Sequence, residues 1–404
     1  MYCRLATLHM HAFIPKSSMR LMRLMRRGAS THVPENTRQI TADMIRKPPM
    51  VYAAALCKAF GRVSHPPLDS KRSARLVSVG VSHYAEKVRW AFDILASTDT
   101  HAFDYVEDAH CPALAAIYTT ELDPQCSAVP IVQLVERSSP PTDGSPHTVQ
   151  RCTVLKDSTL ILKATSPFLY PIDPKRLARV DEWETSLDSQ LGPTVRLLAY
   201  EHYLAKEMRP TFLALATNGV SMVETALFSA FVYSGFIQPR MKKWMGCSQD
   251  ALVLSEKTID DVFAKVSAAL EGKEPGSAFI VGDTFTAADL TFAALASPLL
   301  QIPQFASLQP ASEELPSALR QLAARLRATP AGAHALHCYR HYRFATLDPS
   351  GRGIVPIESD ARTIAFRSGP RDNLAMLSSA AAAFIAAPAL AAYLAPKALA
   401  SLTG

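Results

Sequence analysis

The chain has 404 residues, 48% of them hydrophobic, which is enough for a sizeable core spread over two or three folding units. Residues 1–74 hold thirteen Lys and Arg against three Asp and Glu, so the net charge of +6 leaves −4 for the remainder. This mildly acidic body argues against nucleic-acid binding. Seven widely spaced cysteines without a C-x-x-C pair argue against a disulfide framework or a zinc ribbon and favour a reducing compartment.

The N-terminal segment is basic. Residues 1–34 contain no Asp or Glu, and arginines alternate with Leu and Met in MRLMRLMRR. This pattern is typical of an organelle transit peptide. It also fits a disordered basic extension, or a chain whose true start is Met50. Residues 60–74 are polar with a Pro pair and read as a linker, so we assign 1–74 to a leader and linker.

A strand, a break and a helix follow. Small and apolar residues alternate over residues 77–81, which predicts a strand, and Ser82 stands at the break, where it can cap a helix. Apolar residues then recur at helical spacing as far as Ile94, with the charged ones largely on other sides (Glu86, Lys87 and Arg89). A side chain at such a helix start faces free N–H groups, where an anion is stabilised.

The next hundred residues alternate between strand and helix patterns. We predict strands over 101–106, 129–135 and 148–155, and a helix over 113–120. Pro130 lies near the start of its strand, where its missing N–H is not needed. Asp157-Ser158 then caps a further helix. The order predicts a small α/β domain in which the first helix and the proline strand meet at one edge.

From Pro174 the pattern becomes helical. Residues 196–245 are long and largely apolar, with interruptions at Gly219 and Gly235. Thr286 and Asp289 have the spacing of a capping box, which is a structural feature.

The last helix of the body carries His334, His337, Cys338 and His341 at spacings of three and four. These side chains would lie near one face and could bind a metal. The alternative, which we prefer, is an ordinary amphipathic helix with histidines along its border, because the helix contains no acidic residue to support metal ligands.

Leu374 to Ala395 is uncharged, and as a helix these 22 residues would span about 33 Å, enough to cross a bilayer. Arginines precede the segment and only Lys397 follows it, which favours a body on the cytosolic side. The alternatives are an Ala-rich helix packed on the protein and a frayed tail, because Ala is weakly hydrophobic and Pro388 interrupts the run.

The ordered motifs resemble the glutathione transferase family over roughly residues 75–345. SHYAEKVRWAFD resembles its catalytic turn, AVPIV its cis-proline step, the Asp-Ser pair its acidic-Ser pair, and GDTFTAADL its C-terminal helix-capping segment. The resemblance implies a thioredoxin-like domain over 75–168 followed by an all-helical domain over 174–345. The family often has Gly-Lys before the Val-Pro step, and this chain has Ser127-Ala128 there, so a lysine that could hold a glutathione carboxylate is missing.

The resemblance also implies roles for individual residues. Ser82 would be the catalytic residue, donating a hydrogen bond to the sulfur of glutathione, which serves as co-substrate without a metal. Val129 and Pro130 would offer the backbone that meets the glutathione peptide. Ser158 would hold the γ-glutamyl carboxylate, and Asp157 would pair with the amino group. We place the second substrate, a small hydrophobic electrophile or a peroxide, near three aromatic residues (Trp183, Tyr200 and Tyr203).

Two function classes stay open. The first is a glutathione transferase or a related thiol-dependent enzyme. The second is a non-catalytic, tail-anchored protein similar to the metaxins of the mitochondrial outer membrane. We expect residues 346–373 to be a linker, 374–395 to be a membrane anchor, and the body to form a homodimer. We expect attachment to an organelle, most simply the mitochondrion, with the body in the cytosol, or a cytoplasmic protein if the tail is not an anchor.

Overall fold

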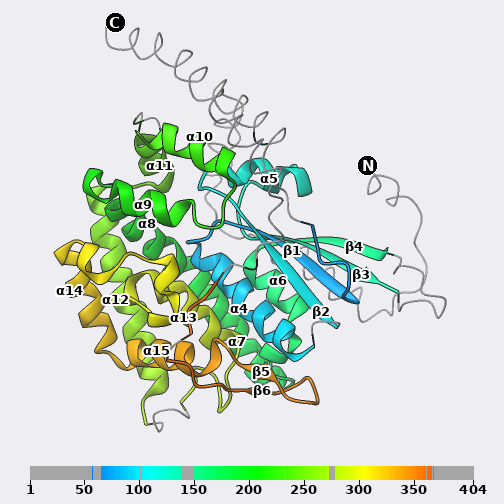
Figure 1. Ribbon diagram of the computed structural model, residues 1–404. Helices are drawn as coiled ribbons and strands as arrows, with labels where there is room; N and C mark the ends of the chain where they lie inside the picture. The colour runs from blue at the N-terminus through cyan, green and yellow to red at the C-terminus, as the bar shows by residue number, and fades with distance from the viewer. Residues whose placement is uncertain are drawn as a thin grey trace, which may run out of the picture.

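The computed structural model describes Cys57 and residues 65–99, 102–138, 149–233, 235, 237–272, 278–360, 362–365 and 367. Most of the expected leader and linker over 1–74, and the whole uncharged run over 374–395, lie outside the described residues. Within the described part, no helix is long and apolar enough to cross a membrane. A sheet lies on one side of the molecule and a larger group of helices on the other (Figure 1).

The sheet has four strands in the order β2-β1-β3-β4. They are β1 (Arg72–Ser78), β2 (Phe103–Ala109), β3 (Ile131–Arg137) and β4 (Val149–Lys156). Strands β1 and β2 are parallel, whereas β1–β3 and β3–β4 are antiparallel. The connecting helices are α4 (His83–Thr98), α5 (Ala115–Leu122) and α6 (Ser158–Thr165). This confirms the thioredoxin-like order, although the first strand, predicted over 77–81, lies at 72–78 and begins before the predicted domain boundary at residue 75.

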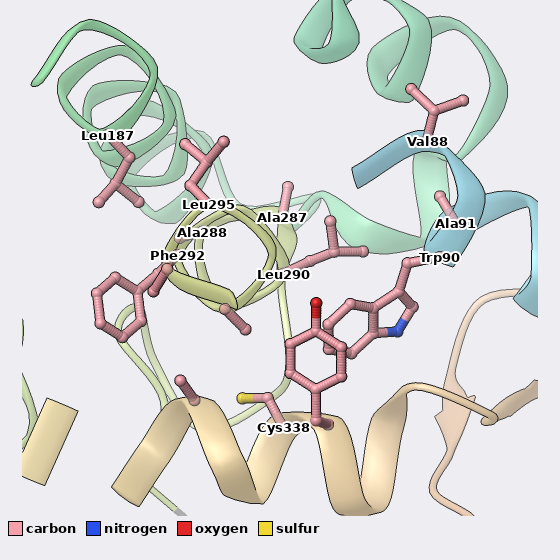
Figure 2. Packing of buried hydrophobic residues seen from close by; sticks show 14 of the residues in the cluster. Val88, Trp90, Ala91, Leu187, Ala287, Ala288, Leu290, Phe292, Leu295 and Cys338 are labelled. Carbon is pink, nitrogen blue, oxygen red and sulfur yellow. The ribbon is translucent and has the colours of Figure 1, made fainter. Parts of the chain in front are cut away.

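Helix α4 is enclosed by both parts of the molecule. Trp90 is fully buried, packs against Tyr339 of α15 with ring centroids 4.6 Å apart, and lies beside Leu290 of α13 (Figure 2). Glu86, Lys87 and Arg89 of α4 are fully buried as well, although the sequence pattern places them away from the apolar side of the helix. Each forms an ion pair with an element that covers it. Arg89 pairs with Glu86 and with Glu107 of β2, and Lys87 pairs with Asp188.

The helical part surrounds α13 (Ala287–Leu300), in which nearly every residue is buried. Around it lie α7 (Pro174–Ser186), a π-helical turn (Leu187–Leu191), α8 (Gly192–Tyr203), α12 (Gln249–Leu270), α14 (Ser317–Arg327) and α15 (Pro330–Tyr342). The capping interaction at α13 is present. The Asp289 carboxylate accepts hydrogen bonds from the N–H and the hydroxyl of Thr286, both at 2.9 Å.

Three shorter helices, α9 (Arg209–Ala216), α10 (Met222–Tyr233) and α11 (Ile237–Met245), lie between α8 and α12 in the chain. The breaks predicted at Gly219 and Gly235 are confirmed, since both have positive φ, 76° and 71°. Helix α10 lies beside α5, near the sheet (Figure 1). Its fully buried Glu224 accepts the backbone N–H of Cys111 at 2.7 Å and contacts His110 Nδ1 at 3.0 Å. This contact ties the inserted helices to the end of β2.

The segment after α15 differs from the expected linker over 346–373. It forms a short hairpin of β5 (Thr346–Leu347) and β6 (Ile354–Val355) and then runs back across both parts of the molecule. Backbone hydrogen bonds of 2.8 Å hold this strap at three places, which are Ile357 N–H to His341 O, Ile364 N–H to Gln304 O, and Glu107 N–H to Arg367 O. The last of these places the strap at the edge strand β2. A linker prediction based on polar composition fails here because the segment is held through its backbone.

Candidate functional site

Three chain segments meet at one end of the sheet. Val77, near the end of β1, is opposite Ile131, the first residue of β3, and Ile131 is opposite Lys156, the last residue of β4. The turn into α4 follows β1, the Val129-Pro130 step precedes β3, and α6 follows β4. All three segments therefore lie at the same end of the sheet. The sheet thus brings the five predicted site residues to one end, where two helix N-termini and the cis-proline step lie.

Ser82 is the N-cap of α4. Its backbone is extended, and its half-buried side-chain oxygen accepts the N–H of Ala85 at 3.3 Å. The cap uses a lone pair of the hydroxyl and leaves the O–H proton available as a donor. Ser82 therefore offers a hydrogen-bond donor at the positive end of a 16-residue helix, a position that stabilises a negative charge.

His83, the neighbour of Ser82, is turned towards the helical part. Its Nε2 lies 3.1 Å from the carbonyl oxygen of Gly192, and since a carbonyl only accepts, Nε2 carries the proton. Burial, followed by the nearby Arg196 charge, lowers the pKa of His83 to about 3. The ring is therefore neutral and engaged with α8.

The Val129-Pro130 peptide bond is cis, as the resemblance implies. Pro130 is buried and Val129 is half-buried. Within the described residues, the backbone N–H and C=O of Val129 have no hydrogen-bond partner. An extended peptide could pair with this free backbone, which continues the line of β3 beyond the sheet.

Asp157 and Ser158 form the start of α6. Asp157 has φ of 77°, a conformation that few non-glycine residues adopt, and its carboxylate accepts the N–H of Leu160 at 3.1 Å. Burial raises the pKa of this carboxyl. Ser158 is 4% exposed and is the first residue of the helix, so its N–H has no partner within the helix. Backbone strain at a helix N-terminus is a feature often found at binding sites.

Sequence reasoning missed a cluster of charges beside the start of α6. Lys87 Nζ donates to Thr159 Oγ1 and to Asp188 Oδ1, both at 2.8 Å, and Thr159 Oγ1 lies 2.6 Å from Asp188 Oδ2. Glu184 of α7 also contacts Thr159, and burial raises its pKa to about 7. The hydrogen-bonded pairs in this cluster are 25 to 101 positions apart, so no local sequence pattern could have identified it. The cluster fixes the first turn of α6 against the helical part.

The three aromatic residues proposed for the second substrate are divided. Tyr200 packs with the cluster of buried residues that covers the α5 side of the sheet, and Trp183 packs with the larger core. Tyr203 contacts both. Tyr200 and Tyr203 therefore lie on the α8 side of the site. Trp183 belongs to another surface, where Lys265 Nζ lies over its ring, 5.0 Å from the ring centroid.

A cavity of about 470 Å³ lies between α8, α11 and α12, and is lined by Leu198, Glu201, His202, Lys242 and Leu252, among others. At about 100° per residue, Leu198 and Glu201 lie about 120° and 180° around α8 from Gly192, and His202 lies on the flank between the Gly192 face and the opposite face. Since Gly192 contacts His83, this cavity faces away from Ser82 and is separate from the site at the sheet end.

The histidines of α15 are used for packing. His334 Nε2 contacts the Asp289 carboxylate at 2.9 Å, and the rings of His337 and His341 lie in tilted contact with centroids 4.4 Å apart. In the described part of the chain, no group of three or more His, Cys, Asp or Glu side chains is arranged to hold a metal ion.

No family model and no curated protein matches this chain. Solved structures similar to it include Ure2p in complex with glutathione, at 16% identity and a TM-score of 0.35, covering 67% of this chain and 95% of that chain. The β-etherase LigF from Sphingobium sp. strain SYK-6 has 17% identity and a TM-score of 0.37, with 65% and 98% coverage. A maleylacetoacetate isomerase from Anaeromyxobacter dehalogenans 2CP-1 has 17% identity and a TM-score of 0.32, with 67% and 96% coverage.

The topology of the chain decides the fold. A β-α-β-α-β-β-α unit with a cis proline before its third strand is followed by a helical bundle whose buried central helix begins with a Thr-Asp capping interaction. The chain has the glutathione transferase fold.

Proposed function

We propose that the protein is a glutathione transferase that activates the glutathione thiolate for attack on a small electrophile or peroxide. The observation that carries the proposal is the meeting of Ser82, the free Val129 backbone and the start of α6 at one end of the sheet. A tripeptide with a carboxylate at one end and a thiol in the middle can contact all three places at once.

Ser82 acts on the sulfur. A free thiol has a pKa near 8.5, so only a few per cent is ionised at neutral pH. A hydrogen bond from the Ser82 hydroxyl to the charged sulfur contributes roughly 1.5–3 kcal/mol, which corresponds to about one to two pKa units. The N-terminus of α4 contributes about 0.3–1 kcal/mol more. Together these interactions make the thiolate the main form without a general base, consistent with the neutral His83 beside it.

The start of α6 holds the γ-glutamyl group. The Ser158 hydroxyl and the first N–H groups of α6 bind its carboxylate. The Asp157 carboxylate binds the amino group, and the Val129 backbone pairs with the cysteinyl residue of the peptide. The residues present therefore fit glutathione at its amino end and at its sulfur.

Titration calorimetry of the full-length protein with glutathione tests this proposal. We expect binding that weakens roughly tenfold in Ser158→Ala, because a hydrogen bond to a charged carboxylate is lost. Ser189→Ala, an exposed serine whose hydroxyl bonds only to its own helix, is the matched control and should bind as the wild type does. Absence of heat and of any thermal shift at millimolar glutathione would reject the enzyme and favour a non-catalytic interaction protein.

A further inference from the structure

One side of helix α8 faces the thioredoxin-like part. Gly192 contacts His83 through its carbonyl, and an added Cβ there would lie 2.0 Å from the Tyr84 hydroxyl. Two turns later, Tyr200 packs on the buried cluster that includes Val77 and Ile131, with its ring edge-to-face against Phe212. Residues four apart lie on the same face of a helix.

Arg196 lies midway between Gly192 and Tyr200 on this face. It is half-buried, and its guanidinium has no hydrogen bond or ion pair with any residue that the structure describes. Its charge acts on the site, since it contributes to lowering the pKa of His83 and opposes the rise that burial produces in the pKa of Tyr84. A half-buried arginine normally forms an ion pair, because its desolvation is otherwise uncompensated.

The charges around Arg196 leave it without a counter-ion. The His83 ring is neutral. The acidic residues on either side of Arg196 in the chain are already paired, Asp188 with Lys87 and Glu201 with Lys242. The guanidinium is a planar fork with five donors, suited to a carboxylate. It acts on His83 and Tyr84, the two residues that directly follow Ser82 at the start of α4.

We infer that Arg196 binds a carboxylate on the second substrate, so that this site takes electrophiles that carry an acidic group near the reacting carbon. The inference rests on the proposed function, because it requires glutathione to occupy the turn at Ser82. It changes the expected substrate from a purely hydrophobic electrophile to an anionic one. Arg196 is then a specificity-determining residue that contacts the substrate.

The test compares three ligands by calorimetry on the full-length protein. These are glutathione, S-(1,2-dicarboxyethyl)glutathione, and the same conjugate with its two added carboxylates esterified. We expect the diacid to bind roughly tenfold to a hundredfold more tightly than the diester, as one charged, bidentate contact would give. Arg196→Gln should remove this preference while glutathione itself binds as before, and Arg196→Lys should restore part of it.

Arg179→Gln, which removes an exposed arginine on α7, is the matched control and should keep the wild-type preference. Thermal unfolding of each variant shows whether it is folded, and the wild-type comparison of diacid with diester needs no variant at all. Equal affinity for diacid and diester in the wild type would overturn the inference and leave the glutathione site standing. The inference would also be overturned if Arg196→Gln lowered the affinity for glutathione by the same factor as the affinity for the diacid. The Arg196 charge would then bind glutathione itself and not the second substrate. A wild type that binds none of the three ligands would reject the proposed function and the inference with it.

Discussion

The close approach of α8 to α4 depends on Gly192. A Cβ at this position would lie 2.0 Å from the Tyr84 hydroxyl and 2.5 Å from its ring carbon Cζ. Ordinary contact begins near 3.4 Å, so in Gly192→Ala the hydroxyl must retreat by about 1.4 Å. That movement also breaks the 3.1 Å hydrogen bond from Tyr84 to the carbonyl of Asp188.

The expected magnitude combines three effects. Overpacking of a well-packed contact costs about 1–3 kcal/mol, and loss of the hydrogen bond costs about 1 kcal/mol. Replacing Gly by Ala within a helix is favourable by about 1 kcal/mol. We therefore expect Gly192→Ala to lower the free energy of unfolding by about 1–3 kcal/mol, although helix propensity alone predicts a gain.

A double-mutant cycle separates these effects. In a Tyr84→Ala background there is no ring to displace, so Gly192→Ala should become stabilising by about 1 kcal/mol. The assay is urea unfolding of the wild type, both single variants and the double variant. If Gly192→Ala has the same sign and size in both backgrounds, the contact between Gly192 and Tyr84 does not govern the packing of α8 on the site.

Two further predictions concern buried carboxylates in the helical part. Asp289→Ala should lower the free energy of unfolding by about 4 kcal/mol, because it removes the hydrogen-bond acceptor of Ile280 N–H, of the Thr286 N–H and hydroxyl, and of His334. Urea unfolding measures this change. A loss under about 1 kcal/mol would show that other groups replace the carboxylate. The folded-state pKa of Glu184, about 7 against the ordinary 4.5, means that its contribution to stability is present below about pH 4.5 and is lost as pH rises through 7. Glu184→Gln should therefore gain stability relative to the wild type above pH 7 and match it near pH 4, and thermal unfolding profiles that stay parallel from pH 4 to 8 would contradict this assignment.

The order of elements in the thioredoxin-like part could be predicted because each element has a local signal. The predicted strand over 129–135 is observed as β3 and the predicted helix over 113–120 as α5, each displaced by about two residues. Ser82 and Asp157 were identified as caps from residue type and position alone, and both side chains accept the expected first-turn N–H groups. Such features are set by neighbours within four residues, which a sequence displays directly.

Long-range polar contacts could not be predicted in this way. Arg343 pairs with Glu86 across 257 residues, and His110 with Glu224 across 114. A charged residue in an amphipathic pattern ordinarily indicates a solvated face, and nothing local shows that a second element will cover it. Arg196 escaped notice for the same reason, because its significance depends on what α8 packs against.

The central claim is that Ser82 stabilises a thiolate, and the most direct measurement is the pH dependence of thiolate absorbance of glutathione bound to the wild type and to Ser82→Ala. In the wild type we expect the bound thiol to titrate about one to two units below the value of about 8.5 for a free thiol. In Ser82→Ala the bound thiol should titrate at higher pH while glutathione affinity changes little, because the contacts at α6 are intact. Superimposable titrations of the two proteins would contradict the account and leave Ser82 as a helix cap alone.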